Sequence, residues 1–284
     1  MYKDKENFSN IAKKCLPSVM IAFVLSAPND TLLGSLLFQK NRDFKVYVPE
    51  NEALYADYEA RLPLVKGGLN QVDEPLVCFL EPGAVPDKDF VRRVLRAQRR
   101  HPSFDLYHVN LAEGKKWPRR LKGEKLFRMT VYEGAKAPLS TFIFRTAALR
   151  ECAVFRADGT LDALPTILAC AKGKIVRNVW RQRLQWTEPQ IAADPQSEER
   201  RIREKLDFYR WTESIWGEDD YPLDLGERLE LITGALAGLY PTYSDDYLKE
   251  ILSGFHAAQG PIRKIRASSA LKGALRRRQK ELEG

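Results

Sequence analysis

Glu81 is the residue of this sequence at which we expect chemistry first. It directly follows Leu76–Leu80, an unbroken apolar run that is too short for a helix. Such a run predicts a strand that is buried on both faces. In an open α/β sheet, ligands bind at the carboxyl ends of the strands. Pro82-Gly83 then predicts a turn and Pro86-Asp87 a helix start, so the carboxylate of Glu81 is expected at a strand end.

Alternating strand and helix patterns surround this acid. The predicted strands are Ser18–Leu25, Phe44–Val48, Leu64–Gly68, Leu76–Leu80, Asp105–Val109, Ser140–Arg145 and Lys174–Val179. The predicted helices are Thr31–Gln39, Asn51–Leu62, Phe90–Arg100, Thr146–Cys152 and Asp162–Lys172. Asn29 or Asp30 can cap the first of these helices. This alternation predicts an α/β fold, with a mostly parallel central sheet and helices on both faces.

The composition changes near residues 188–196, and the rest of the sequence reads as helical. The predicted helices there are Ser197–Trp216, Leu225–Leu239, Ser244–Gln259 and Ile262–Leu282. We therefore predict two domains, an α/β domain over residues 1–190 and an all-helical extension over 191–284.

Charge and cysteine usage narrow the class of protein. The net charge of the 284 residues is +8, and eight basic residues against Glu281 and Glu283 place most of it after Pro261. The nearly neutral remainder gives no reason to expect nucleic-acid binding. Cys78 and Cys170 lie in apolar runs, which predicts buried reduced thiols. No apolar stretch reaches the length that spans a bilayer. The reduced thiols and a polar amino terminus unlike a secretory signal predict a cytoplasmic protein.

The loop residues that follow these strands carry a resemblance to a known family. Val19–Leu25 leads into a proline-and-asparagine loop that contains Asn29, and Lys45–Val48 runs into Pro49-Glu50. Gly68 and Glu81 follow at a matching spacing. With Asp162 before a helix that Gly173 closes, the chain over roughly residues 16–180 resembles the inverting family 2 glycosyltransferases, whose catalytic domain has the GT-A fold.

The resemblance implies a set of site residues. Asp162 corresponds to the general base, which takes the proton from the acceptor hydroxyl as it attacks the sugar. Glu81 corresponds to a ligand of a divalent cation, Mn²⁺ or Mg²⁺, that bridges the donor diphosphate. The residues that would bind the nucleotide-sugar are Ser26, Ala27, Pro28, Asn29, Glu50, Lys66, Glu81 and Gly83.

The sequence departs from the family's pattern at several of these positions. The metal motif, usually two aspartates flanking one residue, is here Glu81-Pro82-Gly83, so glycine replaces the second carboxylate. The first acid of the nucleotide strand is Pro49, and the family's arginine-asparagine pair is Val65-Lys66. Trp180–Arg183 stands where some members place a histidine ligand. Basic residues could supply the charge neutralisation that a metal normally gives.

Simpler interpretations stand beside the functional ones. Asp162 can be only the N-cap of its helix, and Glu81 a surface acid at a strand end. The loop Lys115–Arg128, with seven basic residues and one acid, is either solvated or a cradle for an anionic or lipid-diphosphate acceptor. Three tryptophans could stack on sugar rings, namely Trp117, Trp180 and Trp186.

The amphipathic basic tail Ile262–Leu282 suits an interfacial membrane helix, packing on the protein's own helices, or a second subunit. Together these observations predict a bacterial-type glycosyltransferase that uses a nucleotide-sugar and a polysaccharide or glycolipid acceptor. It would be cytoplasmic, with peripheral contact at the inner face of the membrane through 261–284. The alternative is a catalytically inactive GT-A-like binding or scaffold protein in a glycan-assembly complex, since Gly83 leaves the metal motif incomplete.

Overall fold

The computed structural model describes most of the α/β region and part of the helical region. The described residues are 20–27, 29–49, 56–113, 116–156, 159–187, 195–217, 219–239, 272–273, 275–277 and 279–280. Pro28 and Glu50 of the predicted site lie outside them, as do the predicted helix Ser244–Gln259 and most of the predicted helix Ile262–Leu282.

The chain divides into two compact units, and each is made of segments that are separate in sequence. The first contains Met1–Arg120, Pro138–Cys152 and Val176–Glu188, and the second contains Leu121–Ala137, Ala153–Ile175 and Pro189–Gly284. This division differs from the predicted boundary at residue 190. The assignment of two domains with that boundary stays a prediction.

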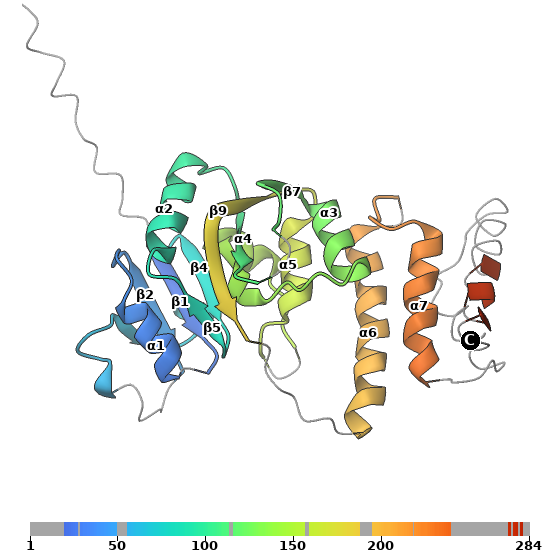
Figure 1. The fold of residues 1–284 in the computed structure, drawn as a ribbon, viewed down its shortest axis with the longest axis horizontal. Helices are drawn as coiled ribbons and strands as arrows, with labels where there is room; N and C mark the ends of the chain where they lie inside the picture. Colours follow the sequence, from blue (N-terminus) through green and yellow to red (C-terminus); the bar gives the residue numbers. More distant parts are fainter. Residues whose placement is uncertain are drawn as a thin grey trace, which may run out of the picture. The chain divides into compact units, whose positions relative to one another are not determined.

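The first unit is built on one mixed sheet. The strands are β1 (Ile21–Leu25), β2 (Phe44–Val48), β3 (Leu64–Lys66), β4 (Leu76–Leu80), β5 (Ala84–Pro86), β6 (Leu106–Leu111), β8 (Phe142–Arg145) and β9 (Ile175–Trp186). Their order in the sheet is β3-β2-β1-β4-β8-β6-β9-β5. Figure 1 shows β1 between β2 and β4, to which it pairs in parallel. β8 runs antiparallel to both β4 and β6, so β4 and β6 point in the same direction.

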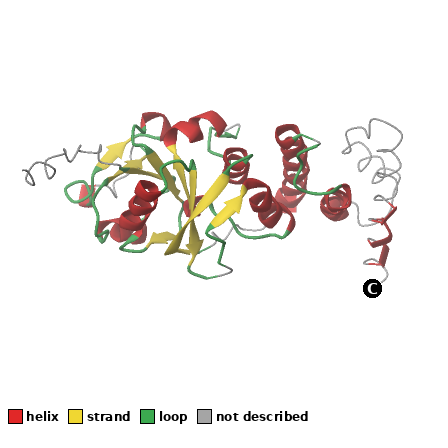
Figure 2. Ribbon diagram, turned by 90° about the horizontal axis from the view of Figure 1, so that it is seen from above, coloured by secondary structure: helices red, strands yellow, loops and turns green. Residues whose placement is uncertain are grey.

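Two helices cover one face of this sheet. They are α1 (Asp30–Leu37) and α2 (Phe90–Arg100), whose apolar residues join a core with alternate residues of β1, β2 and β4. Phe23 of β1 is fully buried there, with its ring 5.5 Å from that of Phe44 and 6.0 Å from that of Phe90. Figure 2 shows helices on both sides of the strands. The short apolar runs thus form buried strands because helices cover them, as their composition predicts.

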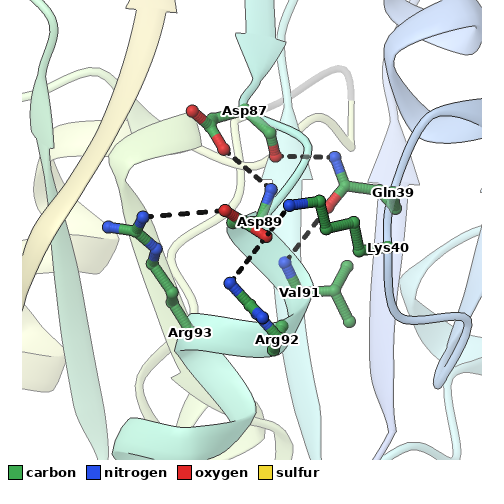
Figure 3. Close-up of polar contacts among 7 residues, drawn as sticks. All are labelled: Gln39, Lys40, Asp87, Asp89, Val91, Arg92 and Arg93. Carbon is green, nitrogen blue, oxygen red and sulfur yellow. Dashed lines mark hydrogen bonds and ion pairs between the residues drawn. The ribbon is translucent and has the colours of Figure 1, made fainter.

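Gln39, which follows α1 in the chain, caps the amino-terminal end of α2. The Gln39 side chain donates to the Asp87 carbonyl at 2.8 Å and accepts from the Val91 backbone N–H at 3.2 Å (Figure 3). Asp89 makes no capping bond of its own. Its carboxylate instead forms ion pairs with Lys40, Arg92 and Arg93 (Figure 3). One amide therefore ties the end of α1 to the start of α2.

The second unit is mainly helical over its described residues. Its elements are α3 (Gly123–Phe127), the π-helix η3 (Arg128–Tyr132), α5 (Ala163–Ala171), α6 (Pro195–Trp216) and α7 (Leu225–Leu239). α6 and α7 share an apolar core that includes Leu206, Leu229 and Leu236. Arg128 donates two hydrogen bonds to the Glu227 carboxylate, and Tyr132 donates to Glu230 at 2.7 Å. The predicted helices Ser197–Trp216 and Leu225–Leu239 are confirmed.

Several local predictions are wrong. Lys115–Arg128 is not one loop, because it contains the strand β7 (Arg120–Lys122) and α3. The described part of the predicted helix Asn51–Leu62 consists of a 3₁₀ segment and turns. The last strand continues to Trp186, so residues 180–183 belong to β9. β5, which pairs with the end of β9, is not predicted at all.

Other side chains also differ from their predicted state. Cys78 is a free, fully buried thiol as expected, whereas Cys170 is disulfide-bonded, as is Cys152. Trp117 is buried and stacks on His108 with ring centroids 3.9 Å apart, so its ring faces protein and does not face a sugar. In the part of the chain that the structure describes, no helix combines the length and the apolar character that crossing a bilayer requires.

Candidate active site

Four parallel strands end at one edge of the sheet, and several of the predicted site residues follow them. Leu25 pairs with Leu80, so Ser26 and Glu81 leave neighbouring strands at the same level. Val48, the last residue of β2, pairs with Lys66, the last residue of β3. Ser26 and Ala27 are exposed, as is Lys66. The structure thus places a hydroxyl, an ammonium group and a carboxylate along this edge.

Asn29 is the N-cap of α1, directly after this edge. Its Oδ1 accepts a hydrogen bond from the Leu32 backbone N–H at 2.9 Å, which confirms the predicted cap. The side-chain oxygen is therefore used by the helix, and only the amide N–H₂ can donate to a ligand. Asp30 follows and accepts a hydrogen bond from the Tyr58 hydroxyl at 3.1 Å.

Ser140 holds the Glu81 carboxylate in place. The Ser140 hydroxyl donates to Glu81 Oε2 at 3.1 Å, and its backbone N–H is 3.2 Å from the same oxygen. The hydroxyl oxygen also accepts from the Glu81 backbone N–H at 2.9 Å. Ser140 is fully buried. Among the described residues nothing binds Oε1, so one carboxylate oxygen remains for a ligand.

Gly83 forms a turn that excludes a second carboxylate. The Ala84 N–H donates to the Glu81 carbonyl at 3.0 Å, with Pro82 and a Gly83 of φ +87° between them, the features of a type II turn. A Cβ atom on Gly83 would lie 2.5 Å from the Thr187 carbonyl oxygen. The Thr187 N–H in turn donates to the Gly83 carbonyl at 3.2 Å. Glycine at this position is thus required by the backbone and by its neighbour.

A cavity of about 320 Å³ adjoins the ends of β2 and β3. Its lining residues are Val48, Glu59, Leu62, Pro63, Leu64 and Lys66. The Lys66 Nζ atom lies 3.7 Å from the Glu59 carboxylate, and both side chains are largely exposed. Such a pair is weak in water, so the lysine can exchange its partner for an anionic ligand.

The residues at this edge do not form a metal site by themselves. Within the described ranges, no group of three or more His, Cys, Asp or Glu side chains could hold a metal ion. Glu81 supplies one carboxylate, and Ser140 already occupies one of its oxygens. Mg²⁺ and Mn²⁺ ordinarily need more oxygen ligands than this. The donor set fits a cation only if a diphosphate completes it.

Asp162 belongs to the second unit, at the start of α5. It occupies the N-cap position, but its side chain makes no capping hydrogen bond. Its carboxylate instead lies 3.5 Å from the Arg156 guanidinium and is about a third exposed. The Asp162 backbone binds Val154 and Thr166, which fixes the residue at the end of a loop. The N-cap interpretation therefore does not explain this side chain.

Sequence reasoning missed the partners of both acids. The sequence indicates only that Ser140 begins a strand, although its hydroxyl binds the carboxylate of Glu81, 59 residues away in the chain. Arg156 lies in the loop before α5, where an antiparallel bridge joins Phe155 to Leu161. A serine before a strand and an arginine in a loop carry no local signal, so neither contact could be found from spacing.

Comparison with known proteins identifies the class of fold. Neither a protein-family model nor a curated protein matches the sequence. Among solved structures, the chain shares a GT-A-like α/β fold with glycosyltransferases, which confirms the predicted fold class.

The particular likeness is to residues 1–349 of TarS from S. aureus. The TarS crystal structure in complex with UDP-GlcNAc is 13% identical, with a TM-score of 0.52 over 83% of this chain and 79% of that one. The complex of TarS with UDP is 14% identical, with the same TM-score over 83% and 80%. At this identity the likeness is one of fold.

Proposed function

We propose that this chain is an inverting glycosyltransferase that moves a sugar from a nucleotide-sugar donor to a polysaccharide or glycolipid acceptor. One observation carries the proposal: Ser26, Lys66 and Glu81 lie at the ends of parallel strands along one carboxyl edge of the sheet, and Lys66 lines a cavity of about 320 Å³ there. Ligands of open α/β sheets bind at this edge. A TarS structure of the same fold contains UDP-GlcNAc, and another contains UDP.

The donor would bind along this edge. The cavity beside β2 and β3 would take the nucleoside, and Ser26, Ala27 and Asn29 follow the neighbouring strand β1 at the same edge. Lys66 would neutralise part of the charge of the diphosphate as it leaves, because a cation next to a developing negative charge lowers the barrier. Glu81, oriented by Ser140, would lie near the same diphosphate. The turn at Gly83 would fix the backbone that directly follows Glu81.

Asp162 would act as the general base. It would take the proton of an acceptor hydroxyl while that oxygen attacks the anomeric carbon and the nucleotide diphosphate leaves. Direct attack inverts the configuration at that carbon. The Arg156 guanidinium lies 3.5 Å from Asp162 Oδ1, so the other carboxylate oxygen, Oδ2, would take the proton.

A divalent cation, when bound with the donor, would stabilise the negative charge of the leaving diphosphate. Glu81 is the protein ligand that this edge offers. Because one carboxylate is too few ligands for the cation, the cation would bind only together with the donor diphosphate. The acceptor class and a peripheral membrane contact through 261–284 belong to the same proposal, because a lipid-linked acceptor would lie at a membrane surface.

The second candidate function is a non-catalytic scaffold of the same fold. The specific observation in its favour is Gly83, whose positive φ and contact with Thr187 exclude the second carboxylate of the metal motif. A scaffold would keep the fold and lose the transfer step.

The deciding experiment is a thermal-shift panel of UDP-, GDP-, CMP- and dTDP-sugars, each with Mn²⁺, with Mg²⁺ or with chelator. A donor at 100 times its dissociation constant should stabilise the protein by about 2.7 kcal/mol, a shift of a few degrees. One class of nucleotide should give this shift, and Glu81→Ala should reduce it. Glu151→Ala, which removes an exposed carboxylate of the helix Thr146–Cys152 away from the cavity, is the matched control and should retain the shift.

Transfer activity then separates the two candidates. Asp162→Asn should bind the donor as the wild type does and lose turnover, because only the base is removed. Donor binding without turnover in the wild-type protein, tested with sugar and polysaccharide acceptors, would favour the scaffold. A flat panel for every donor in a folded sample would overturn the donor site.

A further inference from the structure

A second cluster of charge lies at the opposite edge of the same sheet. Arg177 is the third residue of β9 and pairs in register with Tyr107 of β6, while His101 follows the last residue of α2. β6 and β4 run in the same direction, so the start of β6 and the end of β4 mark opposite edges. This cluster is therefore separate from Glu81.

Uncharged side chains hold the two central arginines of the cluster. The Arg177 Nη2 atom lies 2.9 Å from His101 Nε2, an arrangement in which the guanidinium donates to a neutral imidazole. Arg120 lies over the Phe104 ring, with its Cζ atom 6.0 Å from the ring centre. The His101 and Phe104 rings are themselves in edge contact, 6.0 Å apart. The four side chains form one continuous group.

Positive charge accumulates here without compensation. Among the described residues, neither Arg120 nor Arg177 forms an ion pair with a carboxylate. Desolvation, followed by Arg177, Arg120 and Arg100, lowers the pKa of His101. Desolvation, followed by Arg120 and Arg119, lowers the pKa of Arg177. Asp105 directly precedes β6, and its carboxylate lies 3.5 Å from the Arg145 guanidinium.

The end of α2 explains only part of this charge. Cations are stabilised near the carboxyl end of a helix, which accounts for Arg99 and Arg100 in the last turn of α2. Arg177 comes from a strand and Arg120 from the start of β7, so the helix does not require them. An arrangement in which arginines repel one another while neutral groups orient them is what an anion site needs.

We propose that Arg120 and Arg177, oriented by Phe104 and His101, form a binding site for a phosphate group, separate from the donor site. The planar guanidinium matches the oxygens of phosphate, and the phosphate charge relieves the repulsion between the arginines. The partly exposed positions of Arg177 and His101 and the exposed position of Arg120 leave the site open to solvent. The phosphate can belong to a soluble molecule or to a lipid headgroup.

The test uses the full chain and inorganic pyrophosphate, with binding followed by calorimetry at low salt. The double variant Arg120→Gln/Arg177→Gln should weaken pyrophosphate binding at least about tenfold, the effect of losing charged hydrogen bonds. Arg96→Gln is the control, since Arg96 is exposed on α2 outside the cluster and its change removes one positive charge, against the two that the double variant removes. It should leave the affinity within about twofold.

Vesicles distinguish the two sources of phosphate. Sedimentation with phosphatidic acid vesicles but not with phosphatidylcholine vesicles, lost in the double variant, would assign the site to a lipid headgroup. Pyrophosphate binding without vesicle binding would assign it to a soluble ligand. Equal binding by the wild type and the double variant, no binding by the wild type, or an equal loss in Arg96→Gln would overturn the proposal. The UDP-sugar shift should persist in the double variant, which keeps this site distinct from the donor site.

Discussion

Gly83 shows at the scale of one residue why the metal motif has changed. Restoring an acid there would place a Cβ atom 2.5 Å from the Thr187 carbonyl oxygen and force a side chain into a φ of +87°. A side chain in the left-handed region costs about 1–2 kcal/mol before any clash. The incomplete motif is therefore built into the turn, and a single substitution does not repair it.

We predict that Gly83→Asp destabilises the protein by more than about 2 kcal/mol and creates no Mn²⁺ site. Denaturant unfolding measures the first effect, and calorimetric titration with Mn²⁺ measures the second. Gly134→Asp is the control, because Gly134 also has a positive φ, +66°, but a Cβ there meets no atom within 4 Å. A stable Gly83→Asp protein that binds Mn²⁺ would contradict the account of the turn.

Ser140 is the residue on which the geometry of Glu81 depends. We predict that Ser140→Ala destabilises the protein by about 1–3 kcal/mol, because the buried Glu81 N–H and one carboxylate oxygen lose a partner. The donor-induced thermal shift should also fall, since the carboxylate is no longer held. Ser35→Ala, which removes only a hydroxyl bonded to its own helix, should cost less and leave the shift unchanged. An unaltered donor shift in Ser140→Ala would show that the orientation of Glu81 does not matter.

At the scale of elements, one buried amide joins the end of α1 to the start of α2, beside the Lys40–Asp89 ion pair and a shared apolar core. Gln39 is buried and satisfies both the Asp87 carbonyl and the Val91 N–H (Figure 3). We predict that Gln39→Leu costs about 1–3 kcal/mol, because the Val91 N–H loses its side-chain partner, while the Asp87 carbonyl loses the amide and keeps the Phe90 N–H. Gln39→Glu keeps the acceptor for Val91 but loses the donor to Asp87. It should fall between Gln39→Leu and the wild type in denaturant unfolding. A leucine variant as stable as the wild type would show that water replaces the amide.

How far the sequence predicts the fold differs from element to element. Phe44–Val48, Leu76–Leu80 and Phe90–Arg100 match β2, β4 and α2 to the residue, because local apolar pattern and helix period determine them. β5 has three residues and exists because it pairs with the end of β9, about 100 positions away. α3 needs Gly123, where a Cβ would collide with the Ala171 carbonyl of α5. Such elements depend on tertiary partners and leave no local pattern.

The candidate site divides in the same way. The positions of Ser26, Lys66 and Glu81 follow from their place after parallel strands, so the sequence predicts that they meet at one edge. The bonds that orient Glu81 come from Ser140, and the weak ion pair of Lys66 is with Glu59; no spacing indicates either contact. Asp162 is predicted either as the general base or as only a helix cap, and neither prediction includes the Arg156 guanidinium beside its carboxylate. Strand order is thus readable from sequence, whereas side-chain partners are not.

At the scale of the whole molecule, His108 links packing to acid stability. Burial lowers its pKa to about 3, so it stays neutral in the folded protein at pH 5, whereas an unfolded histidine takes up a proton below about pH 6.5. The unfolded state then binds more protons, and the free energy of unfolding falls by about 2 kcal/mol between pH 7 and 5. In His108→Phe this fall should shrink by that amount in denaturant unfolding, while Trp117→Phe, which keeps the imidazole, should retain it. The same fall in His108→Phe as in the wild type would place the acid sensitivity elsewhere, for instance at His101.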